Sequence, residues 1–132
     1  MSPTGICLND AGGDCIYVNQ RWCQMAGIAP ADALGQGWLA GIHPDDRDRI
    51  ATTWRGVVER RMSGDFEYRM QTPQGAITWV YSQYRPLTDD HGRLIGYLRM
   101  NTDVTQRKLT ERIQDVNRRK DELSKLLDLQ RQ

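Results

Sequence analysis

The residues of this 132-residue chain best suited to covalent or metal chemistry are three cysteines, Cys7, Cys15 and Cys23, and two histidines. A thiolate is a nucleophile and a metal ligand, and an imidazole carries protons and also binds metals. The cysteines are odd in number, and their spacing matches neither a disulfide framework nor a zinc site. We therefore expect three reduced, half-buried thiols in a reducing, cytoplasmic compartment. Cys23 could be a reactive thiol, but we interpret it as a small buried hydrophobic side chain.

The two histidines lie where structural roles are expected. His43 precedes Pro44 at the entrance of an expected helix, which is typical of a cap or turn residue, and His91 lies in a polar turn. Neither is spaced for a metal site, and no local signature indicates a Ser/His/Asp or Cys/His set. Residues 12–14 (GGD) superficially resemble a nucleotide-cyclase motif, but no acidic residue follows and a hairpin turn is needed there. The sequence therefore predicts no catalytic or metal site, and a chain that is not an enzyme.

The composition excludes several classes of partner. The formal net charge is +1, with basic and acidic residues interspersed, so no field favours nucleic acid or a membrane surface. No run of about 20 apolar residues could span a bilayer. The first residues lack the charged and then apolar layout of a signal peptide. We therefore expect a cytoplasmic chain, or a cytoplasmic piece of a longer one.

Turn and cap residues divide the first half of the chain into short elements. Pro44 at a first helical position, with carboxylates behind it, indicates the start of the clearest helix. Apolar residues then recur at helical spacing. The expected elements are a strand over 5–9, a turn over 10–14, a strand over 15–18, a helix between the N-cap Asn19 and Gly27, a short helix over 30–34, and a helix from Pro44 that ends at Ser63 and Gly64.

The second half alternates as strands do. Runs over 66–70, 77–84 and 94–102 are separated by Gly-containing turns and form a three-stranded meander. The first hairpin must join this meander, because an isolated hairpin is barely stable. The sequence thus predicts an α+β domain with an antiparallel sheet. After Gly96 neither Gly nor Pro occurs, and from residue 105 the composition is that of a helix.

Three motifs in this order resemble a subgroup of the PAS family. They are GWLAGIHPDDR over 37–47, FEYR at 66–69 with Gly75 and Trp79-Val80, and the closing segment from Gly92 to Lys108 that ends in DVTQRK. The match covers about residues 4–108. The resemblance implies a PAS fold, in which a five-stranded antiparallel sheet carries short helices on one face and cups a small cavity. It also implies a regulatory role, with a PAS sensor core over 1–104 and a C-terminal signalling helix over 105–132.

The resemblance also bears on cofactors. Haem-binding relatives place a histidine on the long helix, and none occurs over 44–62. Flavin-binding light sensors carry a cysteine motif where this chain has GWLAG. We therefore predict no cofactor, neither haem nor flavin, and leave a small-molecule ligand as an alternative.

The resemblance predicts which side chains line the cavity, whereas hydrophobicity alone would turn Leu98 and Met100 inward. The inward set is Phe66, Tyr68, Met70, Val80, Ser82, Tyr84, Tyr97, Arg99 and Asn101. Arg99 stands where the family commonly has Gly, and an inward arginine is costly without a partner. We hypothesise that it binds an anionic ligand group such as a carboxylate. The alternatives are an internal salt bridge or an outward tilt.

The tail carries apolar residues in alternating steps of four and three, which is the spacing of a coiled-coil seam. The seam is Leu109, Ile113, Val116, Lys120, Leu123, Leu127 and Gln130, with Lys120 and Gln130 as polar interruptions. Asp103 and Gln106 resemble a capping box, and we expect Asp103 and Thr105 to relay a signal from the last strand. The alternative is one helix folded back onto its own sheet.

Both sheet faces are apolar, so the sequence predicts a homodimer paired through the outer face of the sheet and this helix. It also predicts an effector in the same natural chain, either a histidine kinase or a cyclic-dinucleotide enzyme. A competing interpretation is a PAS module that only dimerises and binds no ligand.

Overall fold

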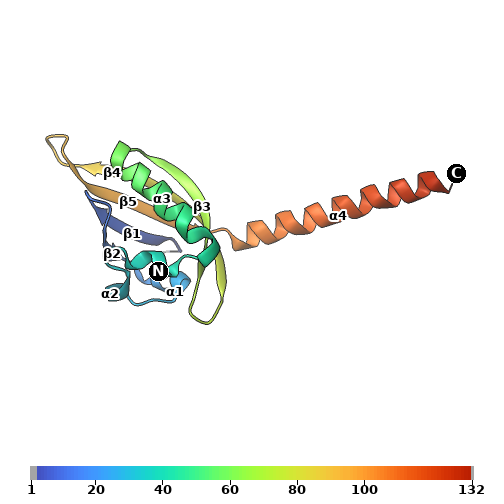
Figure 1. Ribbon diagram of the computed structural model, residues 1–132, viewed down its shortest axis with the longest axis horizontal. Coiled ribbons are helices and arrows are strands. Elements are labelled where there is room, and N and C mark those ends of the chain that lie inside the picture. The colour runs from blue at the N-terminus through green and yellow to red at the C-terminus, as the bar shows by residue number, and fades with distance from the viewer. Residues whose placement is uncertain (1–2, 132) are drawn as a thin grey trace.

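The computed structural model describes residues 3–131, which form a curved antiparallel sheet with helices on one face and a long helix projecting from one end (Figure 1). The strand order is β2-β1-β5-β4-β3, so the first hairpin joins the meander through β5. The elements are β1 (Gly5–Asp10), β2 (Cys15–Val18), α1 (Gln20–Ala26), α2 (Pro30–Ala33), a 3₁₀ helix η1 (Gly37–Gly41), α3 (Pro44–Arg60), β3 (Gly64–Gln71), β4 (Ile77–Thr88), β5 (Leu94–Asp103) and α4 (Thr105–Gln130). The predicted α+β class and five-stranded antiparallel sheet are confirmed.

The first hairpin and α1 follow the local signals in the sequence. Gly13 adopts a positive φ of 93° in the β1–β2 turn, which a residue with a side chain would resist. Asn19 caps α1 by accepting a hydrogen bond from the backbone N–H of Trp22 at 3.0 Å. The same side-chain oxygen accepts from the N–H of Ile6 at 2.9 Å, which ties α1 to β1.

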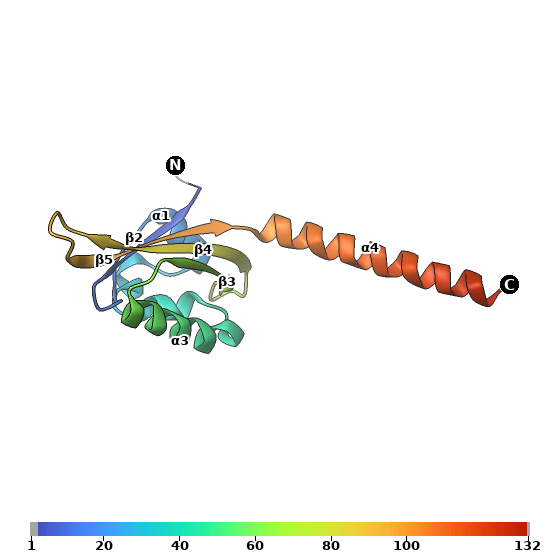
Figure 2. The ribbon, with the colours of Figure 1, turned by 90° about the horizontal axis from the view of Figure 1, so that it is seen from above.

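Helix α3 lies across the inner face of the sheet and closes the core (Figure 2). Its buried stripe includes Ile50, Trp54 and Val57, spaced as an amphipathic helix requires. His43 caps it, with Nδ1 accepting from the N–H of Asp45 at 3.1 Å. The helix ends at Arg61, which takes the left-handed conformation with φ 52°, so it stops before the predicted Ser63 and Gly64.

The strands β3, β4 and β5 are longer than predicted and keep one register until Leu87, where the pairing of β4 with β5 shifts. Tyr68 is opposite Val80 on β4, and Ser82 is opposite Asn101 on β5. Strand β4 runs on to Thr88, four residues beyond the predicted end at residue 84. Because side chains alternate between faces, this register puts one set of residues under α3 and the other on the outer face.

Helix α4 leaves the end of β5 and extends away from the sheet as one continuous helix (Figures 1 and 2). At 1.5 Å per residue its 26 residues span about 39 Å. None of its described residues is buried, so it does not fold back onto the sheet. The predicted capping box is wrong: Val104 is the N-cap residue, with no side-chain cap, and Asp103 accepts instead from the N–H of Thr105 at 2.9 Å.

Candidate functional site

The inner face of the sheet holds every residue predicted from the resemblance to line a cavity. Seven of the nine are buried, and Phe66 and Tyr84 are partly buried against the same core. Leu98 and Met100 lie on the opposite face, so hydrophobicity alone would have chosen the wrong face of β5. The buried seven are Tyr68, Met70, Val80, Ser82, Tyr97, Arg99 and Asn101.

A cage of aromatic rings encloses the guanidinium of Arg99, which is only 1% exposed. Its Cζ lies 4.3 Å from the centre of the Trp38 ring, 4.7 Å from Trp54 and 5.5 Å from Phe66. A desolvated cation–π contact contributes about 2 kcal/mol, so the rings offset part of the cost of burying the charge. The structure therefore shows neither the internal salt bridge nor the outward tilt considered for Arg99.

Polar contacts beside the cage leave two atoms unsatisfied. Arg99 donates from Nη2 to the hydroxyl oxygen of Tyr68 at 3.3 Å, and that hydroxyl donates to Oδ1 of Asn101 at 3.0 Å. Burial raises the pKa of Tyr68, and the charge of Arg99 opposes the shift. Among residues 3–131, Nε of Arg99 and Oγ of Ser82 find no hydrogen-bond partner. Each unpaired buried polar atom costs about 1–3 kcal/mol, which makes this the most polar and least satisfied part of the interior.

A surface cleft of about 170 Å³ adjoins the cage between the β1–β2 turn and α3. Gly13, Gln36 and Arg55 are among the residues that line it, and Trp38 and Trp54 form the boundary that it shares with the cage. The indole Nε1 of Trp54 donates to the carbonyl oxygen of Gly13 at 3.0 Å. The two rings therefore separate the guanidinium from the surface, and their rotation would open a path to it.

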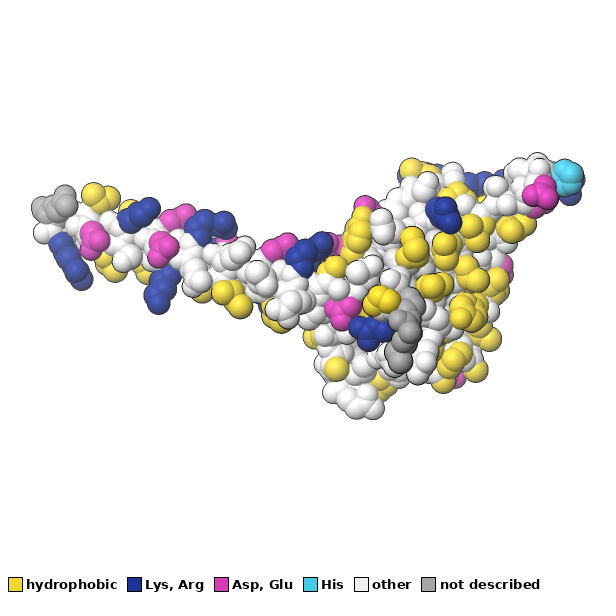
Figure 3. Space-filling view, turned by 180° about the vertical axis from the view of Figure 1, so that it is seen from behind, with side chains coloured by type: hydrophobic (Ala, Val, Ile, Leu, Met, Phe, Trp, Pro, Cys, Tyr) yellow, Lys and Arg dark blue, Asp and Glu magenta, His cyan; other side chains and the backbone are white. Residues whose placement is uncertain are grey.

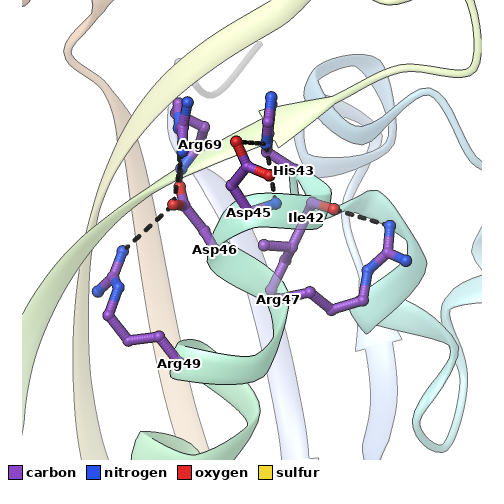
Figure 4. Close-up of polar contacts among 7 residues, drawn as sticks. All are labelled: Ile42, His43, Asp45, Asp46, Arg47, Arg49 and Arg69. Atoms are coloured by element: carbon purple, nitrogen blue, oxygen red, sulfur yellow. Dashed lines mark hydrogen bonds and ion pairs between the residues drawn. The ribbon is translucent and has the colours of Figure 1, made fainter.

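A second polar cluster joins α3 to β3 through Asp46 and Arg69 (Figure 4). Asp46 accepts three hydrogen bonds from Arg69: from the backbone N–H at 2.8 Å, from Nε at 3.0 Å and from Nη2 at 2.8 Å. These bonds hold the pKa of Asp46 below its usual value, against the opposing effect of burial. Arg47 donates from Nη2 to the carbonyl oxygen of Ile42 at 3.0 Å, which fixes the chain that enters α3.

The junction between β5 and α4 is tied to β4 at a single residue, Trp79. The carbonyl oxygen of Trp79 accepts from the N–H of Val104 at 2.8 Å, and its own N–H donates to Oγ1 of Thr105 at 2.9 Å. Asp103 pairs with Arg21 of α1 at 3.3 Å. The two residues predicted to relay a signal thus contact α1 and β4.

Glu67 on the outer face of β3 fastens the first turn of α4. Its carboxylate pairs with Nζ of Lys108 at 2.6 Å and also with Arg107. The hydrogen bond from Lys108 is the main reason that the pKa of Glu67 is lowered. Lys108 and Arg69 both lie over the Trp79 ring, at 5.2 and 5.5 Å from its centre. A continuous set of contacts therefore runs from the start of α3 to the start of α4.

The outer face of the sheet is apolar over β1, β2 and β5, and hydrophobic side chains gather there in Figure 3. Tyr17 is opposite Leu8, which is opposite Leu98 on β5, and Ile6 is opposite Met100. We refer to these five residues as the outer patch. Tyr17 and Met100 are exposed, and the other three are half-buried.

The predicted seam of α4 is exposed throughout. Lys120 is exposed as well, and Leu126 and Leu129 add apolar surface beside the seam. The exposed apolar seam residues are Leu109, Ile113, Val116, Leu123 and Leu127. Helix α4 therefore presents a long apolar stripe that no part of residues 3–131 buries.

Sequence reasoning missed three parts of this arrangement. Trp38 and Trp54 were not assigned to the site, although both are large rings in segments expected to pack on the inner face. Glu67 was noted only as part of a motif. Cys7 and Cys15 are fully buried rather than half-buried, whereas Cys23 is partly exposed.

Within residues 3–131 no group of three or more His, Cys, Asp or Glu could hold a metal ion. No helix of that range is long and apolar enough to cross a membrane. His43 serves as a cap and His91 is exposed in a turn.

The structure is thus an α+β domain in which a cupped five-stranded antiparallel sheet carries helices on one face and continues into a C-terminal helix. The model of the PAS fold family matches residues 15–100, and the chain belongs to that family. PAS domains are generally sensory, non-catalytic modules, and they can bind flavin or other ligands.

Similar proteins include signalling proteins of bacteria. The chain is 28% identical over 111 residues to the C4-dicarboxylate transport sensor protein DctS of Rhodobacter capsulatus, covering 83% of this chain and 17% of that protein. A sensory box histidine kinase/response regulator structure from Burkholderia thailandensis is 26% identical, with a TM-score of 0.66 and 91% of each chain covered. The N-terminal domain of a diguanylate cyclase from Marinobacter aquaeolei shares the fold, with a TM-score of 0.69 at 14% identity over 80% of this chain and 98% of that one.

The chain spans only 13% to 24% of the length of the curated relatives it matches. In those proteins the matching region is thus one part of a multidomain chain.

Proposed function

We propose that this chain is a non-catalytic regulatory PAS module of a longer cytoplasmic signalling protein, whose effector is a histidine kinase or a cyclic-dinucleotide enzyme. It works as a homodimer, paired through the outer patch and α4, and it passes a change in the sheet to the effector through the paired helices. The similarity to a histidine kinase and to a diguanylate cyclase supports this choice of effector.

The observation that carries the proposal is the exposed seam of α4. Five large apolar side chains at coiled-coil spacing face water in the single chain. An isolated helix is marginal in water even at this length, whereas pairing with a second copy buries the seam and stabilises both helices. Lys120 in the seam weakens the pair and sets its register.

The outer patch supports pairing in the same place. It lies on the face opposite α3, beside the strand that continues into α4 (Figures 2 and 3). A sheet with two apolar faces needs cover on both, and the helices of this chain cover only one. A second protomer would cover the outer patch and bring the two α4 helices together.

Sedimentation velocity of the purified chain tests the dimer, with Val116→Glu as the seam variant and Gln114→Glu as its matched control. Val116 lies in the seam and Gln114 on the opposite side of the helix. We expect wild type and Gln114→Glu to sediment as dimers, and Val116→Glu as a monomer with an unchanged circular dichroism signal from the sheet. A wild-type monomer at the highest concentration reached would refute the proposal.

A second candidate function, ligand sensing at Arg99, is favoured by the two unsatisfied atoms of the interior, Nε of Arg99 and Oγ of Ser82. A carboxylate could accept from both and neutralise the buried charge. Because the aromatic cage fills this space, Trp38 or Trp54 must rotate to admit a ligand.

Thermal shift with small carboxylates tests this candidate, beginning with C4-dicarboxylates because one relative is a C4-dicarboxylate transport sensor. Binding should raise the melting temperature of wild type and leave Arg99→Met unchanged. If no carboxylate raises it, the ligand-free dimerisation module is the better description.

A further inference from the structure

Two thiols lie in contact on the inner face of the sheet, between the edge strand β2 and its neighbour β1. Sγ of Cys7 on β1 is 3.6 Å from Sγ of Cys15 on β2, and both residues are buried. A register shift between Leu8 and Asn9 breaks the regular pairing of the two strands and brings these side chains together. The third cysteine, Cys23, is on α1 and forms no part of this pair.

The two sulfurs differ in their capacity to react. The hydrogen bond that the Cys7 thiol donates to the Cys15 sulfur lowers the pKa of Cys15 to about 7, against the opposing effect of burial, and the charge of Arg99 acts in the same direction. The shared hydrogen bond and burial raise the pKa of Cys7. Cys15 is thus the more readily ionised and more nucleophilic of the two thiols, and Cys7 holds the proton beside it.

The pair connects to the rest of the interior. The Cys7 thiol can instead donate to Oδ1 of Asn9 at 3.5 Å, and Nδ2 of Asn9 donates at 2.9 Å to the carbonyl oxygen of Gly13. Trp54, a ring of the cage, donates to that same oxygen. Cys7 also stands directly opposite Arg99 in the β1–β5 pairing. A change at these sulfurs is therefore a change beside the cage and beside the strand that leads into α4.

We propose that Cys7 and Cys15 form a reversible dithiol switch that responds to hydrogen peroxide. The Cys15 thiolate attacks one peroxide oxygen, the O–O bond breaks, hydroxide leaves and the sulfur becomes a sulfenic acid. The Cys7 sulfur then attacks the Cys15 sulfur, a disulfide forms, and the sulfenic hydroxyl leaves with the Cys7 proton as water. The hydroxide released in the first step takes a proton from solvent and becomes the second water. The two thiols lose two electrons in total, and one peroxide is reduced to two waters.

Two features of the fold bear on oxidation of the pair: how an oxidant reaches Cys15, and how far the two sulfurs must move to form a bond. Strand β2 has only four residues and lies at the edge of the sheet, where its one further link is a bridge of two backbone hydrogen bonds, each 2.8 Å, between Cys15 and Gly35. Opening this edge and that bridge would expose Cys15 without unfolding the sheet. From 3.6 Å the sulfurs must approach by about 1.6 Å to reach a disulfide bond length. Once oxidised, Cys7 has no proton for Asn9, and the network that reaches Trp54 loses its first link.

Peptide mass mapping of the intact folded chain tests the switch. Trypsin releases Cys7 and Cys15 together in residues 1–21, because no Lys or Arg precedes Arg21, and Cys23 in residues 22–47. After brief peroxide treatment and alkylation, we expect peptide 1–21 to be unalkylated and lighter by two hydrogen atoms, and peptide 22–47 to be fully alkylated. Dithiothreitol should reverse the change, and the reaction rate should rise as the pH passes about 7.

Variants assign the roles of the two sulfurs. In Cys7→Ser the hydroxyl can still donate to the Cys15 sulfur but cannot form a disulfide, so the sulfenic acid on Cys15 should persist and be trapped by dimedone. Cys15→Ala should react at neither position. Cys23→Ala is the matched control and should form the Cys7–Cys15 bond as wild type does. Circular dichroism of each variant confirms that it is folded, and the wild-type mapping stands without them.

Three outcomes would overturn the proposal: oxidation of Cys23 first, disulfides between chains in place of the internal bond, or three intact thiols in the folded chain at a peroxide dose that oxidises the urea-unfolded chain. None of these outcomes affects the sedimentation test of the dimer, so the thiol switch and the homodimer are tested independently.

Discussion

The ionic cluster at the start of α3 allows a stability prediction with a defined pH dependence. Replacing Asp46 by Asn keeps an acceptor for the backbone N–H of Arg69 but removes the two charged bonds to its guanidinium. A hydrogen bond to a charged group contributes about 1.5–3 kcal/mol. The Arg69 side chain is a quarter exposed, so solvent screening reduces this by about half. We expect Asp46→Asn to lower the free energy of unfolding at pH 7 by about 2 kcal/mol.

The pH dependence follows from the direction of the pKa shift. Folding lowers the pKa of Asp46, mainly through the hydrogen bonds from Arg69, below the value of 3.8 expected in the unfolded chain. The unfolded state therefore binds a proton more readily, and the stabilisation is complete above about pH 5. It is lost as the pH falls through the folded pKa. Asp46→Asn cannot titrate, so the gap between it and wild type should narrow in acid.

Urea unfolding followed by circular dichroism, at pH 7 and at a series of acid pH values, measures both effects. Asp45→Asn is the matched control, because Asp45 occupies the same helical turn but its side chain is 76% exposed. It shares the favourable position near the helix N-terminus without the bonds to Arg69. The reasoning is wrong if both variants lose the same stability at pH 7, or if the gap for Asp46→Asn is unchanged in acid.

Three further predictions concern the interior, the hairpin and the output helix. Arg99→Met should leave the free energy of unfolding unchanged or raise it by about 1 kcal/mol, because an apolar side chain replaces a buried charge that has no carboxylate partner. A loss of about 3 kcal/mol in urea unfolding would contradict this. Asn19→Ala should cost about 2 kcal/mol in the same assay, because the side chain caps α1 and also bonds to β1, and an unchanged midpoint would contradict the capping role. Glu67→Gln should speed amide hydrogen exchange in the first turn of α4 by weakening its pair with Lys108, whereas Glu111→Gln, which is more exposed, should not.

The sequence predicts local structure well where cap and turn residues act alone. Asn19 and His43 cap the helices that follow them, and the β1–β2 turn lies at residues 10–14, because each depends on a few neighbouring atoms. The prediction at Asp103 failed for a tertiary reason. Strand β5 keeps its pairing with β4 through Asp103, so this residue remains in the sheet and Val104 becomes the cap.

The interior was predictable only in part. The family resemblance placed Arg99 on the inner face against its hydropathy. Members of a fold family share the register of their strands, whereas the side chain at one position can differ between them. The cage could not be predicted, since Trp38 and Trp54 come from different elements whose approach depends on packing. The contact between Cys7 and Cys15 depends on a register shift in β1, and no residue in that strand predicts the shift.

The position of β5 explains how so small an interior could control an effector. It is the central strand, paired to β1 on one side and β4 on the other, and it carries Arg99 four residues before its last residue. Only Val104 separates that strand from a rigid helix about 39 Å long. A tilt of about 5° at the junction would therefore move the far end of α4 by about 3 Å, which is comparable to the helix shifts known to switch interfaces. A ligand at Arg99 or oxidation of the thiol pair could therefore move the far end of α4 by several ångströms without a large motion of the core.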